Sequence, residues 1–227
     1  MRNHFKKLAC LFVFVAANAT TGASANSFDD FFRAVRGDNA GAVTALIARG
    51  FDPNTRDANG QTGLLLALRE PSPRVIDALL ASPKTNVEAR NAKDESPLML
   101  AALKGQDDLV AKLLKRDADV NKPGWTPLHY AATGGQLNAI KVLLENHAFI
   151  DAQSPNGTTP LMMAAMYGSA DAIKLLLNEG ADPTMKNEQG LTAIDFAKRA
   201  NRQEAVDWIG TAAARFQRQK PASDGKW

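Results

Sequence analysis

Apolar residues recur along this chain in pairs of short helical patterns separated by polar turns. In "TPLHYAATGG", which begins at Thr126, the threonine suits the N-cap of a helix. Pro127 suits the first helical position, where a missing N–H has no intrahelical partner to lose. The following pattern places Ile140, Leu143 and Leu144 at i, i+3 and i+4, which predicts the inward face of a second helix. The chain is therefore predicted to be all-α and built from helix pairs.

The same pair of patterns occurs five times. The aligned hydroxyl residues differ in number by 34, 30, 33 and 33, and they are Thr62, Ser96, Thr126, Thr159 and Thr192. A regular period of this length indicates a stacked array, in which each repeat must bury its apolar face against its neighbours.

Glycines follow the predicted helices where a residue with positive φ is needed. We expect Gly105, Gly135 and Gly168 to end first helices in this way, and Gly50 and Gly180 to end second helices.

The segment Thr126-Pro127-Leu128-His129, with Ala131-Ala132, Gly135, Leu143-Leu144 and later Gly180-Ala181-Asp182, resembles the ankyrin repeat. The resemblance extends from about Phe28 to Ile209. It implies a solenoid of stacked helix-turn-helix units with short β-hairpin-like fingers, in a domain over residues 26–213. Its parts are an N-terminal cap (26–58), four repeats (59–92, 93–122, 123–155 and 156–188) and a C-terminal cap (189–213), in which Ala193 replaces the proline and Asn201 the glycine.

Two places depart from the repeat pattern. Pro71 and Pro73 replace the glycine that ends the first helix in repeat 59–92, and Pro73 can begin the second helix. Three residues are missing before Trp125, so that finger is expected to be short and to leave a notch in the row of fingers. A loop deletion that the fold simply tolerates is the plainer interpretation.

Residues 1–25 have the pattern of a cleaved secretory signal peptide. A positive start is followed by the apolar run 8–17 and by Ala23-Ser24-Ala25. The run is about half of the ~20 residues that a membrane-spanning helix needs, so we expect no membrane span after cleavage. The single cysteine, Cys10, lies inside this segment, which leaves the mature chain without a thiol. We expect a bacterial periplasmic protein, with onward secretion as the alternative.

Cleavage also changes the charge of the chain. The signal peptide contains three of the 27 basic residues and no acidic one, which leaves 24 of each sign in the mature chain. The mature chain therefore has no net positive charge that would favour binding to nucleic acid. The polar and basic segment 214–227 has no apolar period, and we predict that it is disordered.

His129 is the first residue to consider for catalysis or metal binding. Such a role needs an orienting carboxylate or further ligands, and the mature chain contains only one other histidine, His147. The resemblance instead implies a structural histidine that bonds its own threonine and neighbouring backbone. The equivalent residues are Leu65, Met99, Met162 and either Ile194 or Asp195.

No catalytic or nucleotide-binding motif is present, so we expect neither an enzyme nor a cofactor. Met163 and Met166 are spaced i, i+3, and thioethers can bind Cu(I). Met163 falls at a position predicted to face inward, where methionine commonly fills space in a core. We therefore predict no metal site and retain methionine-based copper binding as a weaker alternative.

The resemblance implies that the chain binds another protein through its concave groove, as a monomer. Partner contacts are implied just before each hydroxyl residue and at the end of each first helix. These residues are Gln61, Arg69, Glu70, Glu95, Leu103, Lys104, Trp125, Thr133, Met166, Tyr167, Leu191 and Arg199. The partner itself is unknown. The alternatives are an immunity or inhibitor protein, or a protective partner of a periplasmic enzyme such as one in peroxide defence.

Overall fold

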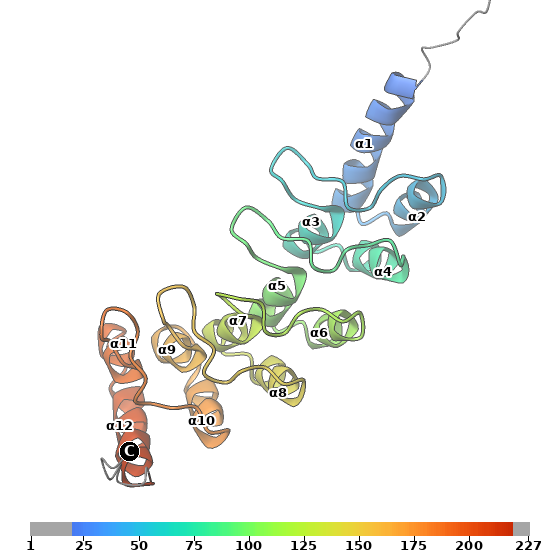
Figure 1. Ribbon diagram of the computed structural model, residues 1–227. Helices are drawn as coiled ribbons and strands as arrows, with labels where there is room; N and C mark the ends of the chain where they lie inside the picture. Colours follow the sequence, from blue (N-terminus) through green and yellow to red (C-terminus); the bar gives the residue numbers. More distant parts are fainter. Residues whose placement is uncertain (1–19, 220–227) are drawn as a thin grey trace, which may run out of the picture.

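The computed structural model describes residues 20–219, and the regular elements in that part are twelve helices. Figure 1 shows the odd-numbered helices in one row and the even-numbered helices in a second row beside it. The all-α repeat fold is therefore confirmed. The helices are α1 (Thr20–Arg36), α2 (Ala40–Ala48), α3 (Gly63–Arg69), α4 (Pro73–Ala81), α5 (Pro97–Lys104), α6 (Asp107–Leu114), α7 (Pro127–Gly134), α8 (Leu137–Glu145), α9 (Pro160–Met166), α10 (Ala170–Asn178), α11 (Ala193–Arg199) and α12 (Gln203–Gln219).

Loops project from the row of first helices as fingers (Figure 1). In the described residues the fingers form a single isolated bridge, between Arg56 and Thr62, and are otherwise stabilised by turns and side-chain bonds. The connection 115–126, between α6 and α7, is shorter than the connection 146–159 between α8 and α9. The short finger predicted before Trp125 is thus present.

The hydroxyl residues cap the first helices as their spacing predicts. In four of them the side chain of the N-cap residue accepts a hydrogen bond from the N–H of the third helical residue. These N-caps are Thr62, Ser96, Thr126 and Thr159. Proline follows the cap in α5, α7 and α9. Each cap satisfies one of the free N–H groups at a helix start, which stabilises a helix by about 1 kcal/mol.

One continuous apolar core runs through the stack. Small residues such as Ala131 and Ala132 are fully buried in α7, and Ile140 and Leu143 of α8 are fully buried beside them. The same arrangement recurs from Phe31 in α1 to Ile209 in α12. Alanine at these positions lets neighbouring helices approach closely, and the leucines and isoleucines fill the space between the two rows.

The glycine predictions are confirmed except at one position. Gly105 and Gly135 have φ of 62° and 65°, and Asn201 adopts 54° in the place of a glycine. The prediction that Gly168 has positive φ is wrong, because α9 ends through Tyr167 and the hydroxyl of Ser169 caps α10 instead. Gly168 is needed for its size: a Cβ there would lie 2.3 Å from the carbonyl oxygen of Ala132.

The structure corrects the predicted C-terminal boundary. Helix α12 continues to Gln219, so residues 214–219, predicted to be disordered, are helical. Trp208, Ala212 and Phe216 continue one apolar helix face at i, i+4 and i+8 and line a groove with α10. Residues 220–227 lie outside the described residues.

The predicted signal peptide, residues 1–25, lies outside the described residues up to position 19, and α1 begins at Thr20. Among the described residues, no helix combines the length and the apolar character needed to cross a membrane.

The seam between α3 and α5 is looser than the others. Leu68 occupies the position of the small residues Ala102 and Ala132, and its side chain is fully buried. Lys104 of α5 occupies the position that Gly134 occupies in α7. A Cβ atom at Gly134 would lie only 2.3 Å from the carbonyl oxygen of Leu103. The Lys104 ammonium instead donates to the carbonyl of Leu68. Consequently α5 packs far less extensively on α3 than on α7 (Figure 1).

This seam predicts two cooperative units in the stack, because neighbouring interfaces set the cooperativity of a solenoid. In hydrogen exchange at moderate denaturant, the amides of α3 and α4 should lose protection before those of α7 to α9. Mass spectrometry of peptides on both sides of the seam measures the two openings. A single opening with equal protection from α3 to α9 would contradict the prediction.

Candidate protein-binding face

The predicted contact residues lie mostly on the accessible side of the first helices and fingers. Eleven of the twelve keep exposed surface, and Tyr167 is the most prominent apolar one, at 62% exposure. The exposed members are Arg69, Glu70, Lys104, Tyr167 and Arg199, and the half-buried members are Glu95, Leu103, Trp125, Thr133, Met166 and Leu191.

Gln61 is the exception. Its side chain is buried, and its Oε1 has no hydrogen-bond partner among the described residues. Its backbone is bound in the turn of the first finger, where the N–H of Gln61 donates to the Asp57 carboxylate. Gln61 therefore offers a partner almost no surface.

An apolar strip runs across the middle of this face. We define it by six residues from α5, α7, α9 and the turn after α9, each partly or fully exposed and outside the core cluster of the described residues. The strip adds three residues to the predicted set, each four positions after the hydroxyl residue that caps its helix. They are Leu100, Tyr130 and Met163. The strip consists of Leu100, Leu103, Tyr130, Met163, Met166 and Tyr167.

The prediction that Met163 faces inward is wrong. Met162 is the buried methionine of the two, and its Sδ accepts the N–H of Thr159 at 3.4 Å. Met163 is partly exposed and lies outside the core cluster, one helical turn before Met166. Copper binding by this pair stays the weaker alternative.

Hydrogen bonds order the face beside the strip. The Tyr130 hydroxyl donates to Glu95 Oε1 at 3.0 Å, and the Asn91 amide donates to Glu95 Oε2 at 2.6 Å. Burial, together with the Glu95 carboxylate, raises the pKa of Tyr130 well above its usual value, so Tyr130 stays a neutral donor. The second finger and α7 are thereby joined before any partner arrives.

His129 is buried and structural, as the resemblance implies. Its Nδ1 accepts the N–H of Thr126 at 3.1 Å, so Nε2 carries the proton and donates to the carbonyl of Thr158 at 2.9 Å. Burial lowers the pKa of His129 to about 4. The neutral ring thus links α7 to the finger of the next repeat, with no nitrogen left for catalysis or a metal.

Chemically different residues take the His129 position in other repeats. The Sδ atoms of Met99 and Met162 accept the N–H of the capping residue at 3.3 and 3.4 Å. In α11 the Asp195 carboxylate accepts the Thr192 N–H at 2.9 Å, so Asp195, not Ile194, is the equivalent residue. Bonds from the N–H and hydroxyl of Thr192 hold the pKa of Asp195 below its usual value.

A buried lysine lies in the short finger, and no spacing in the sequence marks it. Lys122 is 2% exposed, and its Nζ donates to Asp94 Oδ2 at 2.5 Å and to the Trp125 carbonyl at 3.2 Å. The bond from Lys122 lowers the pKa of the Asp94 carboxyl. The Trp125 ring meets the His129 ring edge-on, with their centroids 5.2 Å apart.

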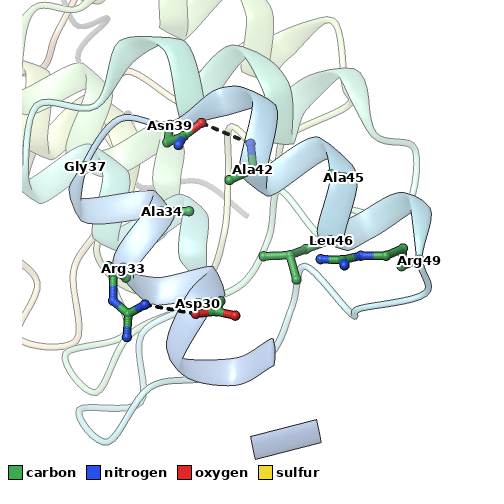
Figure 2. Close-up of a pocket in the computed structure, with 9 residues that line it drawn as sticks. All are labelled: Asp30, Arg33, Ala34, Gly37, Asn39, Ala42, Ala45, Leu46 and Arg49. Carbon is green, nitrogen blue, oxygen red and sulfur yellow. Dashed lines mark hydrogen bonds and ion pairs between the residues drawn. The ribbon is translucent and has the colours of Figure 1, made fainter. Parts of the chain in front are cut away.

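The described residues contain no group of three or more His, Cys, Asp or Glu side chains placed to hold a metal ion. Figure 2 shows a surface depression at the N-terminal end of the stack, where Arg33 is paired with Asp30 at 3.0 Å and Asn39 caps α2. The first contact lies within α1 and the second caps α2, and both are away from the apolar strip. The lining residues are Asp30, Arg33, Ala34, Gly37, Asn39, Ala42, Ala45, Leu46 and Arg49.

A solenoid of stacked helix pairs with an accessible apolar strip is the architecture of a binding module. The family model for ankyrin repeats (3 copies) matches residues 31–123, 64–154, 98–187 and 147–219. The chain therefore belongs to the ankyrin-repeat family, whose repeats form a non-catalytic module that mediates binding to partner proteins.

Known relatives share the repeats over part of their length. The chain is 33% identical over 123 residues to the B-cell lymphoma 3 protein homolog of Mus musculus, covering 51% of this chain and 28% of that protein. It is 33% identical over 124 residues to the neurogenic locus notch homolog protein 1 of Xenopus laevis, covering 53% of this chain and 5% of that protein. The chain thus spans about a quarter or less of the length of these curated relatives.

A solved ankyrin repeat domain from Acinetobacter baumannii has the same fold. The two structures superpose with a TM-score of 0.69 at 22% identity, over 80% of this chain and 96% of that chain.

Burial of neutral His129 predicts a loss of stability in acid. The folded pKa of about 4 lies below the ordinary histidine pKa of 6.5, so the unfolded chain binds more protons as pH falls through this window. The linked loss should reach about 3 kcal/mol by pH 4. The variant His129→Met, which copies the residues at positions 99 and 162, should lack this component. Urea unfolding of both proteins at pH 7 and pH 4.5 measures it, and equal losses in both would contradict the assignment.

Proposed function

We propose that this chain is an exported binding module that holds one partner protein on the face formed by its first helices and fingers. The apolar strip carries this proposal, because exposed aromatic residues and methionines are enriched at the centres of protein interfaces. Trp125, beside the strip, and Tyr167, within it, are the two aromatic anchors. Arg69 and Arg199, at the ends of their helices, would form part of a polar rim.

The mechanism is equilibrium binding to a preformed face. Each repeat is packed on its neighbours, and the Tyr130–Glu95 bond already orders the strip at Tyr130. A rigid face loses little conformational entropy on binding, which leaves more of the contact energy for affinity.

The proposed compartment is the bacterial periplasm. The positive start, the apolar run and the Ala23-Ser24-Ala25 site support export, and a mature chain without cysteine needs no disulfide there. Onward secretion is the alternative destination. A periplasmic partner would be an enzyme that the module inhibits, as an immunity protein does, or protects, as in peroxide defence.

The double substitution Trp125→Ala with Tyr167→Ala should abolish partner capture without unfolding the stack. Truncating an aromatic anchor typically weakens binding by about 2 kcal/mol or more, so losing both should remove the partner from an affinity matrix. The measurement is capture from a periplasmic extract on tagged residues 26–227, with the bound proteins identified by mass spectrometry.

The matched control is Phe149→Ala. Phe149 is 66% exposed but lies in the turn after α8, outside the strip. Its removal should leave capture unchanged. Capture that survives the double substitution and fails with Phe149→Ala would move the binding site to the side of the second helices.

Export has its own test. When the whole chain is expressed in a Gram-negative bacterium, the periplasmic fraction should contain a protein that begins at Asn26, since small residues at positions 23 and 25 form the cleavage site. The variant Ala25→Arg should block cleavage and serves as the control. An intact N-terminus in the cytoplasmic fraction of the unmodified chain would refute export.

A further inference from the structure

The ion pair in the short finger differs from the others among the described residues. Four of the five recorded pairs join side chains that are at least about one-third exposed, whereas the side chain of Lys122 is 1% exposed. Its partner Asp94 is 63% exposed and also bonds Arg90 at 3.3 Å. Only the cation is withdrawn from water.

The buried ammonium has two acceptors from different repeats. Asp94 belongs to the finger before α5, and the Trp125 carbonyl belongs to the short finger itself. Because Nζ reaches both, the backbone at Trp125 is tied to the preceding finger where the missing residues would otherwise have formed a longer loop. Gly124, with φ of 83°, turns the chain immediately before Trp125.

The link continues beyond Trp125. Its ring lies edge-on to His129, and His129 Nε2–H donates to the carbonyl of Thr158 in the following finger. A chain of contacts therefore crosses three successive fingers. Its members are Asp94, Lys122, Trp125, His129 and Thr158. Trp125 stands at its centre, half-buried and with surface left on the binding face.

Stability alone does not explain a lysine here. Withdrawing an ammonium from water is unfavourable by several kcal/mol, and an apolar side chain of similar length is often as stable or more so in such a place. What an apolar side chain lacks is the hydrogen bond to the Trp125 carbonyl and the attraction to Asp94.

We propose that Lys122 is a positioning residue, which replaces the missing part of the finger and holds Trp125 in the orientation in which it meets a partner. The role of Trp125 in binding rests on the proposed function. The restraint on Trp125 does not, and it can be measured in the protein alone.

The test uses Trp125 as the single tryptophan, in a chain that carries Trp208→Phe and Trp227→Phe. Lys122→Met keeps the length of the side chain and removes its charge and both bonds. We expect acrylamide to quench Trp125 about twofold more strongly and its fluorescence anisotropy to fall, because an untied side chain samples more rotamers on the nanosecond scale. Asp94→Asn should shift both quantities in the same direction by a smaller amount.

Two variants serve as matched controls. Lys112→Met breaks the exposed ion pair with Asp77, and Arg90→Met removes the other cation on Asp94; both should leave Trp125 unchanged. Circular dichroism establishes that each variant is folded. If Lys122→Met does not fold, Asp94→Asn decides the question.

Unchanged quenching and anisotropy in folded Lys122→Met, or in Asp94→Asn where that variant decides, would overturn the positioning role. That result would leave the partner-binding proposal intact, because it involves no partner. Conversely, a failure to capture a partner through Trp125 would leave the restraint by Lys122 standing.

Discussion

The spacing between neighbouring first helices depends on buried alanines and on glycines at the helix ends. Buried alanines let α5, α7, α9 and α11 lie close together, and the absence of a side chain at Gly134 and Gly168 lets a helix end approach the preceding carbonyl. Close packing of this kind transmits the position of one helix to the next. Where Leu68 and Lys104 replace the small residues, the helices separate and a polar bond fills the seam. The spacing of the first helices along the accessible face is therefore set by residues beneath it.

A second constraint is the free N–H of each capping residue, which must find an acceptor once it is buried. A histidine nitrogen, two methionine sulfurs and a carboxylate perform the same task in different repeats. In these four repeats the position holds a side chain that can accept a hydrogen bond, and it does not require histidine; Leu65, at the same position in α3, is buried without accepting one. His129 differs in also donating to the next finger, which makes it a link between repeats.

Local patterns in the sequence predicted most of the fold. The hydroxyl spacing located the first helices, Pro73 marked the start of α4, and Asn201 was recognised in the place of a glycine. These features depend on residues close together in the chain. Two features that the sequence did not reveal depend on more distant neighbours. Gly168 is constrained by a carbonyl 36 positions earlier, at Ala132, and the buried Lys122 bonds an aspartate 28 positions earlier, at Asp94. Met163 shares its register and its partial exposure with Leu100 and Tyr130, four positions after the capping residue.

The loose seam between α3 and α5 also has a mechanical consequence. A solenoid has interfaces only between successive repeats, so a pulling force applied at its two ends passes through every interface in series. The series separates first at its least packed junction, which lies between α3 and α5. A protein bound across that junction would act as a splint, and the tension at which the stack extends would then report whether the face is occupied.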